Sequence, residues 1–332
     1  MHEQLRLLKG QEYYETEILP KLKHKSDEFF LLAMATQTNY DSPNRFEDTC
    51  KYFEGSIKSH ANKFNIFNYA KFLQEHNQFK EAEEYYSQYL EDFSLQLSQA
   101  EYAMTLNNLA VLHSDQNNYQ DALLEYEEAL EIRRKLAEAN PNAYLPDVAT
   151  TLNNLAILHR NQNNYQDALQ EYEEALGICR KLAETNPNTY LPDVATTLNN
   201  LANLHSDQNK YEEALLEYEE ALGIYRKLAE ANPNAYLPDV ATTLINLSIY
   251  FQDAVAQRGK SLEYVKEAME IILPIVDRVP FTKRYMQNAI RVLENWDLSD
   301  EEIEQMIEDK KKETDAKELN SSSQELFLKS KL

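Results

Sequence analysis

Residues 144–152 read YLPDVATTL, and the same nine letters return at 190–198 and at 236–244. The spacing is 46 residues each time, and residues 144–189 match the following 46 residues at 36 positions. A long internal repeat at a fixed period is typical of a solenoid, in which one supersecondary unit is copied and stacked. The chain is therefore expected to form an elongated array of units.

Each unit contains two amphipathic segments. In the first, apolar residues recur at helical spacing over 152–158, after Pro146 and Asp147, two residues suited to the first turn of a helix. A polar break over 161–164 (NQNN) separates it from a second helical segment over 165–182, which Asn186-Pro187 ends. Two helices joined by a short turn cannot bury their apolar faces alone, so neighbouring pairs must stack. The sequence predicts an all-α fold of helix pairs.

The order of residues within the pair resembles the tetratricopeptide repeat. That pattern runs large, Leu, small, aromatic in the first helix and aromatic, Ala, aromatic, Ala in the second. It is matched here by Leu152, Leu155, Ala156, His159, Tyr165, Ala168, Tyr172 and Ala175. HEAT and armadillo arrays have a similar period, but they do not predict the Tyr-x-x-Ala-x-x-x-Tyr-x-x-Ala spacing.

The phrase PDVATTLNNLA and the long second helix are similar in particular to the repeats of kinesin light chains and their prokaryotic relatives. The period of 46 is longer than that family's own, and no heptad segment for pairing with a motor chain is present, so kinesin cargo binding is not implied. The resemblance implies a helix-turn-helix solenoid, a right-handed superhelix of about six helix pairs with capping helices.

The same register divides the whole chain. Ser299 and Glu302 form a capping-box signal for a helix near the C-terminus. The tail beyond it is polar and without periodicity, which is typical of disorder. The expected divisions are an N-terminal capping helix (1–24), a degenerate helix pair (25–62), the repeat array (63–277), C-terminal capping helices (278–312) and a disordered tail (313–332).

Composition excludes several classes of function. The formal charge of −23 and the pI near 4.7 disfavour nucleic acid and anionic membranes as partners. Only five glycines occur, and none is in a cluster that could hold a phosphate. Cys50 and Cys179 are far apart and have no metal-ligand spacing, which fits a reducing compartment. With no signal-peptide pattern and no apolar run of about 18 residues, we expect a cytoplasmic protein.

Histidine recurs at one position of three units, as His113, His159 and His205. The ligands of one zinc ion must converge within about 2.1 Å of it, whereas these residues lie 46 apart on successive helices. They are interpreted as aromatic-like packing between the two helices, with the glutamates of QEYEEAL on the solvated side. Because no nucleophile–base order is present either, we expect no enzyme, no cofactor and no metal site.

An asparagine series is the strongest binding signal. The first helices of a tetratricopeptide array line its concave face, and the sixth position of the pattern points into the groove. Asparagine holds that position at Asn68, Asn108, Asn154, Asn200 and Asn246. A carboxamide both donates and accepts a hydrogen bond, so the series could bind the main chain of an extended peptide. The alternatives are that each amide bonds an adjacent helix, or that copying alone retained it.

Neighbouring groove positions differ between units. They are Thr150, Asn153, Ile157 and Asn161 in one unit and Thr196, Asn199, Asn203 and Asp207 in the next. Variation at such positions sets specificity when side-chain pockets distinguish ligands, although it also arises by neutral drift. No lysine stands at these positions in the clear repeats, so the cationic clamp of related peptide-binding arrays is not visible.

The sequence therefore predicts a noncatalytic scaffold that binds a peptide segment or a helix of a partner protein in its concave groove. The alternative is a ligand-responsive regulatory subunit whose curvature controls a separate effector. Two features of the tail stay open. Ser330-Lys331-Leu332 matches a peroxisomal targeting signal, and the match is either functional or a product of chance. For Leu326-Phe327-Leu328 the alternatives are docking on a partner, occupation of the chain's own groove, and no role.

Overall fold

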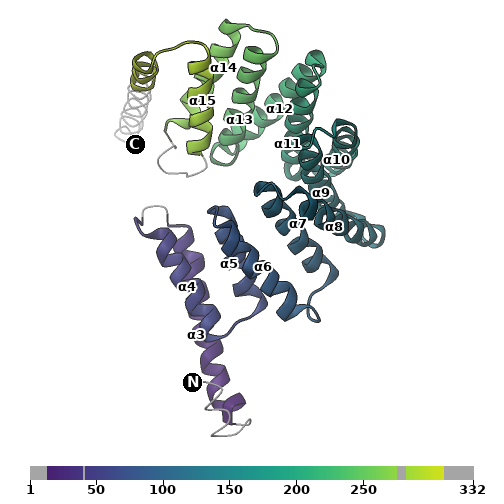
Figure 1. Cartoon of the computed structure of the whole chain (residues 1–332), viewed down its shortest axis with the longest axis vertical. Coiled ribbons are helices and arrows are strands. Elements are labelled where there is room, and N and C mark those ends of the chain that lie inside the picture. Colours follow the sequence, from purple (N-terminus) through teal and green to yellow (C-terminus); the bar gives the residue numbers. More distant parts are fainter. Residues whose placement is uncertain (1–12, 40–41, 275–281, 310–332) are drawn as a thin grey trace, which may run out of the picture. The chain divides into compact units, whose positions relative to one another are not determined.

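The computed structural model describes residues 13–39, 42–274 and 282–309, and every element within those ranges is a helix (Figure 1). The all-α fold of consecutive helix pairs is thus confirmed. The elements are η1 (Tyr14–Ile18), α3 (Leu19–Gln37), α4 (Arg45–Ser59), α5 (Lys63–Glu75), α6 (Phe79–Phe93), α7 (Gln99–Asp115), α8 (Tyr119–Ala139), α9 (Pro141–Asn161), α10 (Tyr165–Thr185), α11 (Pro187–Asp207), α12 (Tyr211–Ala231), α13 (Pro233–Asp253), α14 (Arg258–Ile272) and α15 (Thr282–Asn295). The tail over 313–332, with both of its motifs, lies outside the described residues.

The chain forms two compact units, Met1–Pro141 and Asn142–Leu332. In the first, α3 packs on α4, α5 on α6 and α7 on α8. In the second, α11 packs on α12 and α13 on α14, while α10 and α12 contact the first helix of the next pair. Helix α15 packs against α13 and α14. The domain limits drawn from the sequence stay a prediction.

Small and large side chains alternate in the core of each pair. Ala156, Ala168 and Ala175 are fully buried, and so is the ring of Tyr172. Alanine lets two helices approach closely, and the tyrosine occupies the space that a larger neighbour would take. The positions that carry the repeat pattern are therefore the ones that hold each pair together.

The first helices begin earlier than the sequence analysis placed them. Helices α11 and α13 start at Pro187 and Pro233, where a proline suits the first turn because its missing N–H is not needed there. Helix α9 likewise starts at Pro141, so that Pro146 lies inside it. The Asn-Pro dipeptide that was interpreted as the end of one helix therefore also begins the next, and a single residue, Asn186, separates α10 from α11.

Four turns, those joining α5 to α6, α7 to α8, α9 to α10 and α11 to α12, contain an asparagine in the left-handed conformation. Asn163 has φ = 60°, and Asn77, Asn117 and Asn209 take nearly the same angle. Asparagine tolerates this region better than other residues with a side chain. In the turn between α9 and α10 the N–H of Asn164 donates to the carbonyl of His159 at 2.8 Å, which closes the end of α9. The predicted polar break lies at this turn.

Replacing Asn163 tests this turn. Asn163→Ala should lower the melting temperature by roughly 2–4 °C, because a left-handed alanine costs about 1 kcal/mol. Asn163→Gly should leave the melting temperature within about 1 °C of the parent, since glycine adopts this φ freely. Thermal unfolding followed by circular dichroism measures both. If glycine lowered the temperature as far as alanine, the hydrogen bond from Tyr165 to the Asn163 side chain, 2.9 Å long, would be the cause instead.

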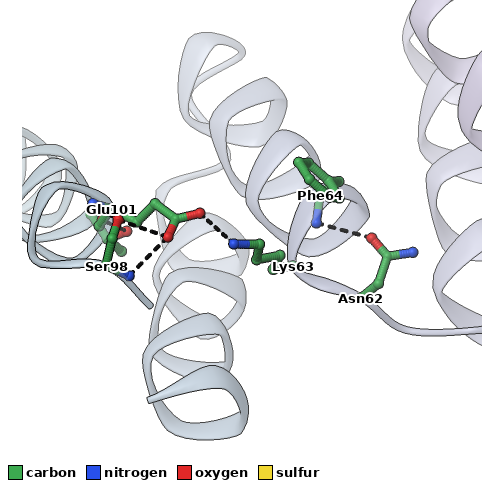
Figure 2. Close-up of polar contacts among 6 residues, drawn as sticks. Asn62, Lys63, Phe64, Ser98 and Glu101 are labelled. Atoms are coloured by element: carbon green, nitrogen blue, oxygen red, sulfur yellow. Dashed lines mark hydrogen bonds and ion pairs between the residues drawn. The ribbon is translucent and has the colours of Figure 1, made fainter. Parts of the chain in front are cut away.

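Two successive pairs of the first unit are joined by an ion pair (Figure 2). Ser98 caps α7, and its hydroxyl accepts a hydrogen bond from the N–H of Glu101, while the Glu101 carboxylate accepts one from the N–H of Ser98 at 2.9 Å. The other carboxylate oxygen lies 2.6 Å from Nζ of Lys63, the first residue of α5. These bonds, that from Lys63 above all, lower the pKa of Glu101 to about 2.

The lowered pKa makes this contact sensitive to acid. A carboxyl group with a depressed folded-state pKa stabilises the fold fully above its unfolded value of about 4.3, and the contribution is lost as the pH falls toward 2. Lys63→Met should raise the pKa of Glu101, as measured by NMR titration of its carboxyl carbon. The melting temperatures of the variant and the parent should differ at pH 6 and converge near pH 2.

Lys71→Met is the matched control, because Lys71 and Glu75 form an exposed pair on one helix at 3.7 Å. It should leave the acid dependence unchanged. An unaltered titration of Glu101 in Lys63→Met would contradict the role assigned to Lys63.

The predicted capping box near the C-terminus is present. The N–H of Ser299 donates to the Glu302 carboxylate at 2.8 Å, and the N–H of Glu302 donates to the Ser299 hydroxyl at 3.3 Å. A helix follows over 300–309. The hydrogen bonds from Ser299 lower the pKa of Glu302.

Candidate functional site

Two pockets lie along the first helices of the second unit (α9, α11 and α13 in Figure 1). The one between α9 and α11, called here the α9–α11 pocket, has a volume of about 220 Å³. Six of the predicted groove residues line it, with Pro146, Ala149, Cys179 and Asp193 around them. Those six are Thr150, Asn153, Asn154, Ile157, Thr196 and Asn200.

The second pocket, called here the α11–α13 pocket, has a volume of about 240 Å³. It contains the predicted residues Asn203 and Asn246, and it lies at the C-terminal ends of its helices. The rest of its lining is Arg160, Ser206, Asp207, Tyr211, Tyr218, Ile249, Tyr250, Asp253 and Ala254. Because α11 contributes to both pockets, they follow one another along the same helix.

The asparagine series divides into two groups. In the first unit, Asn68 donates to the carbonyl of Phe64 in its own helix at 2.8 Å, and Asn108 donates to the hydroxyl of Tyr86 at 3.3 Å. In the second unit, the amides of Asn200 and Asn246 make no hydrogen bond with any residue that the structure describes. Asn200 and Asn246 line the two pockets, whereas Asn68 and Asn108 already bond residues of their own unit. Asn154 also lines the α9–α11 pocket, but it already has an interaction within the chain.

The neighbouring asparagines tie successive first helices together. Nδ2 of Asn153 donates to Oγ1 of Thr197 at 2.9 Å, and Nδ2 of Asn199 donates to Oγ1 of Thr243 at 2.7 Å. Their Oδ1 atoms are buried and have no hydrogen-bond partner among the residues that the structure describes. Both residues stand at positions that were predicted to set specificity. In the structure their amide nitrogens form hydrogen bonds that join one first helix to the next.

The repeated histidines are polar links. Nδ1 of His205 lies 2.9 Å from the carboxylate of Glu217 on the partner helix, and the side chains are only 11% and 16% exposed. The same contact joins His159 to Glu171 and His113 to Glu125. The packing interpretation missed this hydrogen bond, and the first glutamate of each EYEEAL segment does not lie on the solvated side. Burial raises the pKa of Glu125, against the lowering effect of His113.

Removing one acceptor measures what this link contributes. Glu217→Ala should lower the free energy of unfolding by about 1–3 kcal/mol, because the buried ring nitrogen of His205 then lacks an acceptor. Glu217→Gln keeps an acceptor oxygen and should cost less. Glu219→Ala, an exposed position on the same helix, is the control and should change little. Urea denaturation ranks the variants, and equal losses at positions 217 and 219 would show that the link is not stabilising.

Arg160 is a charged residue of the α11–α13 pocket that the repeat pattern did not predict. Its Nε lies 2.6 Å from the carboxylate of Asp207 in the next repeat. Burial lowers the pKa of the guanidinium, but the hydrogen bond to Asp207 and the negative charge of that carboxylate together outweigh it, so the net shift of the pKa is upward. The signal was available, since Ser114 and Ser206 hold this position in the neighbouring units.

The lining groups suit binding and offer little for covalent chemistry. Cys179 is 1% exposed, and burial raises its thiol pKa to about 11. Among the described residues, no group of three or more His, Cys, Asp or Glu side chains is placed to hold a metal ion. None of the described helices is both long and apolar enough to span a membrane. The polar groups of the two pockets are amides, hydroxyls, carboxylates and the guanidinium of Arg160.

Comparison with family models gives matches in the middle of the chain. Residues 134–181 and 147–227 match one model described as tetratricopeptide repeat, and residues 103–142 match a second of the same description. No curated protein matches the sequence.

Solved structures share the fold. The crystal structure of BtubC (BKLC) from P. vanneervenii is 22% identical, with a TM-score of 0.51, over 78% of this chain and 94% of its own. The apo form of RapI is 16% identical, with a TM-score of 0.53, over 81% of this chain and 99% of its own. At these identities the likeness is one of fold alone.

Proposed function

We propose that this chain, which is a tetratricopeptide-repeat protein, is a noncatalytic scaffold that binds an extended segment of a partner protein along α9, α11 and α13. The observation that carries the proposal is the pair of open amides, Asn200 and Asn246, in two consecutive pockets. Because these amides make no hydrogen bond with the described residues, a ligand can use both the donors and the acceptor of each.

The size of the pockets favours a peptide over a small molecule. Their volumes of about 220 and 240 Å³ fall below the roughly 300–1,000 Å³ of small-molecule sites. Each pocket is therefore suited to one side chain. Packed helices lie about 8–10 Å apart, and an extended chain advances about 3.3 Å per residue, so successive amides would meet roughly every third residue of the segment.

The sign of the charge bears on which segments bind. The chain carries a formal charge of −23, so electrostatic attraction accelerates association with basic segments and slows it with acidic ones. Nucleic acid is repelled by the same charge.

The test removes the open amides. Asn200→Ala with Asn246→Ala should weaken binding of a peptide selected from a displayed dodecapeptide library by about 10- to 30-fold, since each lost hydrogen bond is worth about 1 kcal/mol. Isothermal titration calorimetry measures the affinity, and circular dichroism checks that the helices remain.

Asn68→Ala with Asn108→Ala is the matched control, because those two amides are already bonded within the first unit. It should leave the affinity unchanged. Equal loss in both double variants, or no loss in either, would remove the open amides from the mechanism.

A further inference from the structure

We propose that the α11–α13 pocket binds an arginine side chain of the partner segment, with its guanidinium paired to Asp253. This inference rests on the proposed groove function and names the chemistry of one of its two pockets. Three observations support it: the comparison of successive repeats, the charge at the helix ends, and the groups left available in the pocket.

The repeat supplies an internal example of the interaction. A shift of 46 residues maps Arg160 onto Ser206 and Asp207 onto Asp253. In the earlier position, Arg160 reaches from α9 to Asp207 at the end of α11, with 2.6 Å between Nε and Oδ2. In the later position, serine is too short to reach the next carboxylate. Ser206 and Asp253 both line the pocket, and its one cation, Arg160, is paired with Asp207, so Asp253 has no arginine of its own.

The ends of the helices add negative charge at this place. Helices α11 and α13 end at Asp207 and Asp253, although a carboxylate is unfavourable at the partially negative C-terminus of a helix. Arg160 compensates Asp207. Asp253 is exposed and makes no ion pair or hydrogen bond with any described residue. The one cation and two carboxylates of the lining leave a formal charge of −1, which favours a positively charged ligand group.

The tyrosine hydroxyls of the pocket are already engaged. Tyr250 donates to the carbonyl of Tyr211 at 2.9 Å, and Tyr218 donates to Oδ1 of Asn203 at 2.6 Å. Aromatic rings therefore form the walls, and rings attract cations. What remains for hydrogen bonding is mainly the acceptors of Asp253 and Asn246.

A guanidinium suits this set better than an ammonium. Its planar head carries five donors and can bond a carboxylate and an amide oxygen at once. The ligand group would thus occupy the place in the later repeat that the Arg160 side chain fills in the earlier one.

Peptide pools test the charge requirement. We would use fluorescein-labelled dodecapeptides, randomised without Asp or Glu and carrying arginine at one central position. Two matched pools carry citrulline, which is neutral and nearly isosteric with arginine, or glutamate at that position. By fluorescence polarisation, the full chain should bind the arginine pool about tenfold more tightly than the citrulline pool, because a hydrogen bond to a charged group is worth about that factor. Added salt should reduce the difference.

Asp253→Asn should abolish that preference, whereas Asp115→Asn, the equivalent position at the end of α7, should preserve it. Equal affinity for the arginine and citrulline pools would overturn this assignment and leave groove binding intact. If the glutamate pool bound most tightly, the ligand group in the pocket would be a carboxylate paired with Arg160, and the assignment would again be overturned. Binding of no pool would contradict the proposed function itself.

A variant that supplies the missing cation gives an independent readout. Ser206→Arg should pair with Asp253, raise the melting temperature by about 1–3 °C, and remove the preference for the arginine pool by filling its place. Ser206→Gln fills the pocket without charge and should not raise the melting temperature. If Ser206→Arg lowered the melting temperature, or raised it equally in the Asp253→Asn background, the pocket would not be a guanidinium site.

Discussion

The burial of the alanine face of each helix against its neighbours is the constraint on which the structure depends. Ala156, Ala168, Ala175 and their equivalents in the neighbouring units are fully buried, and the pair they belong to has no other way to hide its apolar surface. Stacking follows from this, and stacking places the first helices of consecutive pairs side by side. The two pockets of the second unit exist because α9, α11 and α13 are held in that order.

Polar links then fix how the stacked helices meet. Three histidine–glutamate contacts connect helices within pairs, and two asparagine–threonine hydrogen bonds connect first helices of successive pairs. The amide nitrogens of Asn153 and Asn199 are satisfied in this way, whereas their buried Oδ1 atoms, which have no hydrogen-bond partner among the described residues, offset part of the stabilisation. Because each copy of the unit carries the same partners, duplication reproduced the links together with the core. The positions left over, at the pockets, are where copies differ without disturbing the array.

Most of the fold could be predicted from sequence, because periodic Leu, Ala and Tyr positions report directly on which face is buried. The helix starts could not, since two prolines five residues apart fit a first turn equally well and only the backbone shows that Pro146 lies inside α9. The lining of the pockets was partly predictable. The register of Asn154 and Asn200 pointed to the surface where the α9–α11 pocket lies, and a binding role for them stays a prediction, whereas the bonding of Asn153 and Asn199 depends on Thr197 and Thr243, which lie 44 residues further along the chain. Arg160 was not predicted because it stands at a position where the copies differ, with serine at 114 and 206, whereas the repeat pattern consists of the positions that they share.

The central claim is that a partner segment lies along α9, α11 and α13, and site-specific photocrosslinking tests it most directly. Benzoylphenylalanine would replace Ile157, which lines the α9–α11 pocket, or Glu173 on the exposed face of α10 as the control, and each chain would be irradiated with the selected dodecapeptide. The account predicts a peptide adduct from position 157 and none from position 173. Adducts of equal yield from both positions, or from position 173 alone, would contradict it.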